Sequence, residues 1–213
     1  MIEILSIFLT LITFLIFSNL PLNFYLVKKG FYTKISYSES MLINLIINCN
    51  FLLLLSFFFI DLNFIFLIYL IGMVICLLYY LKDFLKLVKK NLLLNIFFLS
   101  IFYSISLIIT KNAYLEWDGL AHWFSKVSVF YQGGHYQDLV GLTFDYYPHL
   151  GSYLWAFFWK NSLIQNEYLG RLFFVFIFLI SIFSLNNKLT NKYSIFEKLF
   201  IIFLIIYLST NIF

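Results

Sequence analysis

Two carboxylates separated by one tryptophan, Glu116 and Asp118, are the side chains of this sequence best suited to chemistry. They follow an apolar run that predicts a membrane helix, so we expect them at the membrane surface. A carboxylate there with a second acid beside it is a candidate general base. An alternative role for Asp118 is to cap a helix beginning at Gly119, because aspartate is a favoured N-cap residue.

The helix predicted after this pair, residues 119–132, is amphipathic. Asp118, His122 and Lys126 follow at intervals of four on one face, and a pair of glycines predicts the helix end. The other face carries Leu120, Trp123, Phe124, Val127, Phe130 and Tyr131. One interpretation is an interfacial helix with its apolar face in lipid. The other is a row facing a cavity, with Asp118 as the base and cationic or hydrogen-bonding groups behind it for a phosphate.

The three histidines do not form a recognisable metal motif. His122, His135 and His149 are 13 and 14 residues apart with no cysteine nearby, which matches no compact zinc site. We therefore expect no cofactor, and no divalent metal is indicated. Asp138 and Asp145 lie in a loop where aspartate commonly forms turns, with a second catalytic acid as the alternative.

These residues belong to the most polar stretch of an otherwise apolar chain. Residues 111–170 hold all four tryptophans, all three histidines and six of the eight glycines. The chain is 63% hydrophobic and 11% charged, and its mean hydropathy of +0.94 excludes a soluble domain. Runs that are apolar on every face, such as residues 51–60, exclude a membrane β-barrel and predict an all-α transmembrane fold. Cys49 and Cys76 lie inside such runs and indicate neither a disulfide framework nor a metal site.

The apolar runs predict a multi-pass protein, because roughly 20 apolar residues cross the hydrocarbon of a membrane. We expect about six spans plus outer juxtamembrane amphipathic helices. The six segments are residues 2–26, 41–60, 62–81, 92–110, 170–186 and 196–213. We expect two units: N-terminal transmembrane helices in residues 1–91, and a second module in residues 92–213 whose outer loop is residues 111–169.

Lysines cluster in three of the connections. Ten of the fourteen cations are Lys28, Lys29, Lys34, Lys82, Lys86, Lys89, Lys90, Lys188, Lys192 and Lys198. Because cytoplasmic loops are enriched in lysine, we expect a protein of the cell inner membrane with residues 111–169 on the periplasmic or extracellular side. Residues 148–160 would reverse this order if they crossed the membrane. They are short and rich in interface-seeking aromatics, so we expect a helix on the outer leaflet, with a spanning helix as the alternative.

Four motifs follow one another in residues 92–213. They are Glu116-Trp117-Asp118 after a helix, an amphipathic helix ending in glycine, Tyr147-Pro148-His149-Leu150 with Trp155, and Asn166-Glu167 with Arg171-Leu172. This order resembles the GT-C superfamily of lipid-linked glycosyltransferases. It comes closest to the protein O-mannosyltransferase and aminoarabinose transferase branch, glycosyltransferase family 39. The family's Y-P-P-L motif has His149 in place of its second proline here.

The resemblance implies transfer of a sugar from a polyprenyl-phosphate donor to an acceptor at the outer face, with inversion at the anomeric carbon. It implies that Asp118 deprotonates the acceptor and that Glu116 is the second acid of the pair. The candidates for binding the lipid phosphate and the sugar are His122, Trp123, Lys126, Tyr147, His149 and Arg171. For Arg171 the alternative is a role as an interface anchor.

Other functions remain open alongside a transferase. GT-C proteins usually continue well beyond this length, which leaves room for a partner subunit or a further C-terminal region. Membrane lipid and the lipid-linked sugar are the expected partners, and nucleic acid is not. The alternatives are a non-catalytic flippase, transport or assembly component, and an inactive fragment of a glycosyltransferase. Ion-coupled transport would need ionisable groups within the spans, and apart from Asp61 at a turn these are nearly free of charge.

Overall fold

The computed structural model describes residues 2–19, 36–58, 60–111, 114–160, 162, 166–189 and 194–210. Every regular element within these ranges is a helix, which confirms the all-α fold class. The elements are α1 (Ile2–Asn19), α3 (Tyr37–Ser56), α4 (Leu62–Lys90), α5 (Leu92–Lys111), η2 (Gly119–Phe124), α6 (Ser125–Tyr131), η3 (Tyr136–Leu139), α7 (Leu150–Lys160), α8 (Tyr168–Leu189) and α9 (Ile195–Thr210).

Four helices are long and apolar enough to cross a membrane. They are Tyr37–Ser56, Leu62–Asp83, Leu92–Thr110 and Tyr168–Asn186, and they match four of the six predicted spans. The other two predictions fall on α1, with 18 residues, and α9, with 16 residues. At 1.5 Å per residue α9 is about 24 Å long, shorter than hydrocarbon about 30 Å thick. Residues 20–26 and 211–213 of these two predictions lie outside the described residues, so four spans are supported and six are not confirmed.

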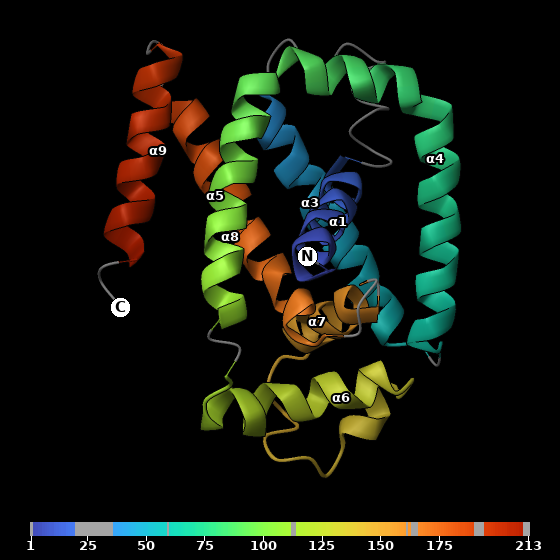
Figure 1. Cartoon of the computed structure of the whole chain (residues 1–213). Helices are drawn as coiled ribbons and strands as arrows, with labels where there is room; N and C mark the ends of the chain where they lie inside the picture. Colours follow the sequence, from blue (N-terminus) through green and yellow to red (C-terminus); the bar gives the residue numbers. More distant parts are fainter. Residues whose placement is uncertain are drawn as a thin grey trace.

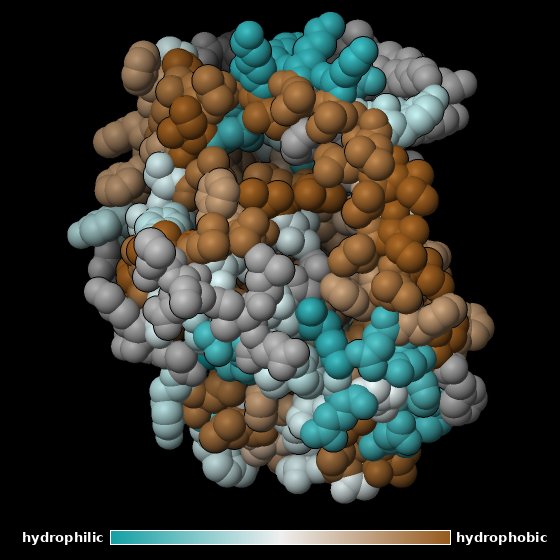
Figure 2. Space-filling view, turned by 45° about the vertical axis from the view of Figure 1, so that its right-hand side comes forward, coloured by the Kyte–Doolittle hydropathy of each residue, from teal (hydrophilic) through white to brown (hydrophobic). Residues whose placement is uncertain are grey.

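Of the four candidate spans, α4 is the one least covered by the rest of the protein. Only 6% of its apolar window is buried inside the protein, against 56% for α8. A long apolar helix with uncovered sides suits surroundings of hydrocarbon. Figure 2 shows broad brown surface between teal surface at the top and in the lower part of the view. This apolar belt, with polar groups beyond it, supports a membrane protein.

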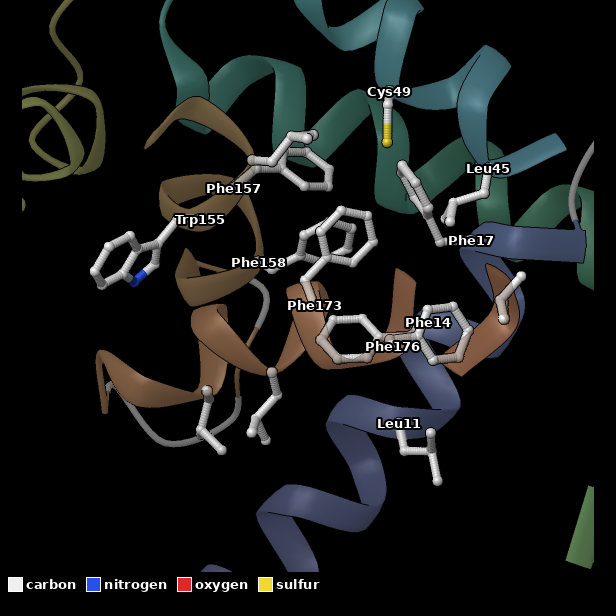
Figure 3. Packing of buried hydrophobic residues seen from close by; sticks show 14 of the residues in the cluster. Leu11, Phe14, Phe17, Leu45, Cys49, Trp155, Phe157, Phe158, Phe173 and Phe176 are labelled. Atoms are coloured by element: carbon white, nitrogen blue, oxygen red, sulfur yellow. The ribbon is translucent and has the colours of Figure 1, made fainter. Parts of the chain in front are cut away.

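Phenylalanine rings fill the centre of the bundle. Phe14 and Phe17 of α1 meet Phe158 of α7 and Phe173 of α8, with ring centroids between 5.0 and 5.9 Å apart. Phe158 and Phe173 themselves stack at 4.0 Å. Figure 3 shows these rings pointing toward one another from three helices. Helices from both predicted units, residues 1–91 and 92–213, therefore share one core.

Two asparagines hold α1 across this bundle. The side-chain amides of Asn44 and Asn48 in α3 donate to the carbonyl oxygen of Phe17 at 3.0 and 2.7 Å. That carbonyl is in the last turn of α1, where backbone acceptors have no partner within the helix. In Figure 1 α1 is seen almost along its axis, whereas α3 runs obliquely from the top toward the bottom of the view and the labelled part of α4 runs up and down it. The first predicted span thus crosses the neighbouring helices instead of lying parallel to them.

The connections gather at two opposite ends of the bundle. At one end, Ser36 before α3, Lys90 at the end of α4 and Lys198 in α9 line one pocket. At the other end, the ring of Phe57 after α3 lies 5.4 Å from the ring of Tyr136 in the predicted outer loop. These ends are the top and bottom of Figure 1. Lys90 and Lys198 therefore lie together at the end opposite the loop, as the sequence predicts, whereas Lys28, Lys29, Lys34 and Lys192 lie outside the described residues.

The environment of α7 differs from its prediction. The helix has 11 residues, about 17 Å, which confirms that it is too short to cross the membrane. It does not lie on a lipid surface, however, because the seven side chains from Ser152 to Phe158 are all buried in the protein. Both α6 and α8 pack on it. Its aromatic residues resemble an interfacial pattern, but they serve to join the outer layer to the bundle.

Candidate functional site

The predicted outer loop forms a layer across one end of the bundle, at the bottom of Figure 1. It is attached to the turn between α3 and α4, where Oγ of Ser56 lies 2.9 Å from Nε2 of His149. Gly133, which follows α6, has φ of +94° and approaches the same turn. A Cβ at Gly133 would lie 3.1 Å from Oδ1 of Asp61, so glycine suits both the conformation and the close approach.

The two acids of the predicted catalytic pair are exposed. Asp118 has helical backbone angles, φ −61° and ψ −42°, and its side chain makes no capping hydrogen bond. The alternative interpretation of Asp118 as a helix cap is therefore wrong, because helical geometry already begins at Trp117. Within the described residues, neither Asp118 nor Glu116 has a salt-bridge partner. The pair is open to solvent or to a substrate.

The helix after the pair starts as a π-helix, Gly119–Phe124, and becomes an α-helix at Ser125. A π-helix has i→i+5 hydrogen bonds, is rare, and is frequently found at functional sites. The predicted row of Asp118, His122 and Lys126 is not a shared polar face. Asp118 is exposed, His122 is half-buried, and Lys126 is fully buried. The wider π turns and the packing of α6 on α7 turn the row progressively into the protein.

Aromatic rings surround His122. The imidazole centroid lies 3.8 Å from the ring of Phe144 and 5.4 Å from the rings of both Trp117 and Tyr147. Phe144 has φ of +60°, an unusual backbone conformation for a bulky residue. Nε2 of His122 is buried and has no hydrogen-bond partner among the described residues. This nitrogen is therefore a buried polar atom whose hydrogen-bonding capacity is unsatisfied within the described residues.

Lys126 binds the loop that follows. Its Nζ donates to the carbonyl oxygen of Tyr147 at 2.8 Å and to that of Asp145 at 3.3 Å. Burial lowers the pKa of Lys126, and the nearby negative charge of Asp145 opposes this shift. The predicted phosphate-binding role of Lys126 stays a prediction. In this structure its ammonium already has two acceptors within the chain.

His149 is buried between the loop and α3. Its ring lies 4.6 Å from that of Tyr136, and its Nε2 shares a hydrogen bond with Ser56. Burial lowers the pKa of His149, and the positive charge of Lys126 lowers it further. The imidazole is therefore held in its neutral form near pH 7. This position makes His149 a link between the layer and the bundle.

Arg171 pairs with Glu167 at the start of α8. Nε of Arg171 lies 2.9 Å from Oε1 of Glu167, and a second nitrogen donates to Oε2 at 3.2 Å. The guanidinium also lies 5.8 Å from the ring centre of Trp155. Burial raises the pKa of Glu167, while the charge of Arg171 opposes that shift. Arg171 is thus engaged with its own chain, and its predicted contact with a lipid phosphate remains untested.

The predicted site residues fall into two groups. The first is the layer beside the acid pair, where the ring of Trp123 lies 6.1 Å from that of Tyr147 and its carbonyl accepts from Oγ of Ser152 at 3.3 Å. The second is Arg171 with its partners. The ring of Phe124 lies 6.1 Å from that of Trp155, which is the aromatic neighbour of Arg171. The aromatic rings around His122 are brought together, whereas Arg171 is separated from them by α7.

Three contacts of the predicted site residues were absent from the sequence prediction. Phe144 covers His122, Ser56 holds His149, and Glu167 holds Arg171. The last pair was visible as an acid four residues before a base on one helix face. Ser56 and His149 are 93 residues apart, and no local pattern connects them.

The described residues contain no group of three or more His, Cys, Asp or Glu side chains placed to hold a metal ion. No protein-family model, curated protein or solved structure matches the chain. The GT-C resemblance therefore stays a prediction based on the order of its motifs. The geometry of the acid pair and its aromatic surroundings is the basis for the function proposed next.

Proposed function

We propose that this protein is a membrane glycosyltransferase that moves a sugar from a polyprenyl-phosphate donor to an acceptor. The observation that carries the proposal concerns Asp118 at the start of a π-helix. Its carboxylate is exposed and makes no capping hydrogen bond. Capping of the following helix does not account for this acid, and it has no salt bridge within the described residues. A free carboxylate beside an unusual helix suits a reacting group better than a structural one.

The reaction assigns one proton transfer to Asp118. Its carboxylate takes the proton of the acceptor hydroxyl or amine as the acceptor oxygen or nitrogen forms a bond to the anomeric carbon. The bond between that carbon and the phosphate oxygen breaks, and the polyprenyl phosphate leaves with the electron pair. Attack opposite the leaving group inverts the anomeric configuration. Glu116, two residues before Asp118, is the second acid of the pair and does not take this proton.

The aromatic cluster around His122 supports a sugar-binding role for this layer. Aromatic rings offer flat apolar surface on which the C–H face of a sugar can pack. Nε2 of His122 is buried without a partner within the described residues, so a substrate hydroxyl or phosphate oxygen would satisfy it. Trp123 and Tyr147 complete the same cluster. We propose His122 as the polar contact and these rings as the stacking surface.

The cations favour a second candidate function. Lys126 is bound to two loop carbonyls and Arg171 to Glu167, so the groups proposed for phosphate binding are engaged within the chain. A cation whose acceptors all come from its own chain is typical of a structural position. A non-catalytic assembly subunit of a lipid-linked-sugar system accommodates this pairing. The two functions differ in whether Asp118 is required for turnover.

A transfer assay separates the two candidates. Membranes containing the full chain are incubated with radiolabelled polyprenyl-phosphate sugars, and label leaving the lipid fraction is measured. We expect turnover by the wild type and a loss of at least about a hundredfold in Asp118→Asn, which keeps the shape and removes the base. The matched control is Asp83→Asn, an exposed acid at the opposite end, which should retain full activity.

Two other outcomes of this assay count against the transferase. Equal turnover by wild type and Asp118→Asn contradicts the role of Asp118. Absence of turnover with every donor, while the protein is correctly inserted and binds a lipid-linked sugar, supports the assembly subunit. Glu116→Gln should give an intermediate loss, because the second acid assists and does not accept the proton.

A further inference from the structure

A pocket of about 430 Å³ opens at the end of the bundle opposite the acid pair. Three helices begin around it, namely α3, α5 and α9. Its lining is Ser36, Tyr37, Lys90, Asn91, Leu93, Leu94, Ile195 and Lys198. The pocket brings together two lysines that are 108 residues apart in the sequence, together with a hydroxyl and an amide. No acid lines it.

The acids closest in sequence to the pocket residues bind the starts of their own helices. Oε2 of Glu39 accepts a hydrogen bond from the backbone N–H of Ser36 at 2.8 Å, in the capping box of α3. Glu197 accepts from both the backbone N–H and the hydroxyl of Ser194, at 2.7 and 2.8 Å. Within the described residues neither Lys90 nor Lys198 forms a salt bridge. Two lysines therefore line this pocket, and no acid of the described residues is paired with either.

A small, mostly apolar cavity adjoins the inner side of the pocket. Tyr37 and Leu94 line both this pocket and a small cavity of about 20 Å³ deeper in the bundle. The remaining lining of that cavity is Leu15, Ser38, Met41, Asn95, Phe98, Ile180 and Phe183. The candidate spans of α3 and α5 begin at Tyr37 and Leu92, so the pocket lies at the edge of the apolar belt. Polarity thus falls from the pocket mouth inward, as it does along a lipid molecule.

We infer that this pocket binds the phosphate-bearing headgroup of an anionic glycerophospholipid. Lys90 and Lys198 bind the phosphodiester, Ser36 and Asn91 hydrogen-bond to its oxygens or to the glycerol, and the acyl chains follow the outer surface of the belt. Basic pockets between membrane helices at the headgroup level are suited to such lipids. A soluble phosphate would use the lysines but would make no use of the apolar lining residues Leu93, Leu94 and Ile195. The inference is independent of the proposed transferase activity, because it concerns the other end of the bundle.

Lipid binding by the full chain can be measured directly. The protein is purified in a neutral detergent, and native mass spectrometry follows the binding of phosphatidylglycerol and of phosphatidylcholine. We expect phosphatidylglycerol to bind at least about tenfold more tightly than phosphatidylcholine, since each nearby lysine favours an anionic headgroup. The double variant Lys90→Gln with Lys198→Gln should lose this preference.

A matched pair of lysines controls for overall charge. Lys82→Gln with Lys86→Gln removes the same charge near the same end without touching the pocket, and it should keep the preference. Lys90→Arg with Lys198→Arg keeps the charge and should also keep the preference, which separates binding from misfolding. Equal affinity for the two lipids, or an equal loss in both Gln pairs, would overturn the inference. So would competition by inorganic phosphate or by an acidic peptide at the affinity of the lipid, because the ligand would then not be a lipid.

Discussion

Nζ of Lys126 lies 2.8 Å from the carbonyl oxygen of Tyr147, and no part of the lysine side chain reaches solvent. The same ammonium donates to the carbonyl of Asp145. One side chain of α6 thereby holds two points of a loop 19 and 21 residues further along the chain. The loop in turn places Phe144 and Tyr147 against His122. The geometry of the candidate site therefore depends on a residue that contacts no acid of the pair.

Lys126→Met should loosen the outer layer. The substitution keeps the aliphatic stem but leaves two backbone acceptors without their donor, and a buried unsatisfied group costs about 1–3 kcal/mol. We expect the free energy of unfolding to fall by about that amount and amide exchange to accelerate in residues 141–149. Thermal unfolding and hydrogen exchange in detergent measure both effects. Lys86→Met at an exposed position is the control, and unchanged exchange in Lys126→Met would contradict the structural role.

His149 should make stability depend on pH below neutrality. Because burial lowers the pKa of His149 below its ordinary value of 6.5, the unfolded chain binds a proton more readily than the folded chain. Stability is therefore lost as the pH falls from about 6.5 toward the lowered pKa, by at most about 1.4 kcal/mol per pH unit. Unfolding temperatures of the wild type and of His149→Gln, measured between pH 8 and 5, test this. The variant, which can still hydrogen-bond to Ser56, should show a shallower slope.

Gly170, the glycine of α8, should not tolerate a side chain. A Cβ there would lie 2.5 Å from the carbonyl oxygen of Trp155 and 2.7 Å from its ring. The backbone oxygen cannot move aside cheaply, so Gly170→Ala should destabilise the protein by about 1–3 kcal/mol. Gly72→Ala in α4 is the matched control, because nothing lies within 4 Å of its Cβ position. That change should be neutral or slightly stabilising, since alanine favours a helix; equal effects in both variants would contradict the close approach of α7 and α8.

The two ends of the bundle should react with reagents from opposite sides of the membrane. In a background with Cys49→Ala and Cys76→Ala, single cysteines are introduced at the exposed positions Lys86 and Gln137. A membrane-impermeant maleimide applied to intact cells should label Gln137→Cys and not Lys86→Cys, because lysine-rich ends favour the cytoplasm. After permeabilisation both should be labelled. Labelling of both positions in intact cells would contradict the predicted topology.

Several elements of the fold were predictable from local pattern. The four candidate spans follow from runs of apolar residues, and the distribution of lysines predicts the shared end of Lys90 and Lys198. The glycine pair after α6 predicts its end, and Gly133 does adopt a positive φ. The buried position of α7 was not predictable in this way. An aromatic segment suits a lipid surface and a protein core equally well, and only neighbouring helices decide between them.

The candidate site also combines features that local pattern predicts with features that it does not. The spacing of Asp118, His122 and Lys126 predicts a common face on an ideal α-helix. A π-helix changes that register, and no pattern in Gly119–Phe124 announces it. The predicted Asp118 cap failed for a related reason, because helical geometry starts before the residue that the local pattern selects.

Hydropathy and composition are enough to predict an all-helical membrane protein with a polar, aromatic segment carrying Glu116 and Asp118. The hydrocarbon of a membrane requires long apolar helices and excludes open strands. The packing of the helices, in contrast, is needed to see that Lys126 holds a loop, that His149 meets Ser56, and that Lys90 and Lys198 share a pocket. Such contacts join residues far apart in the chain. They depend on how the helices pack, and no short stretch of sequence encodes that packing.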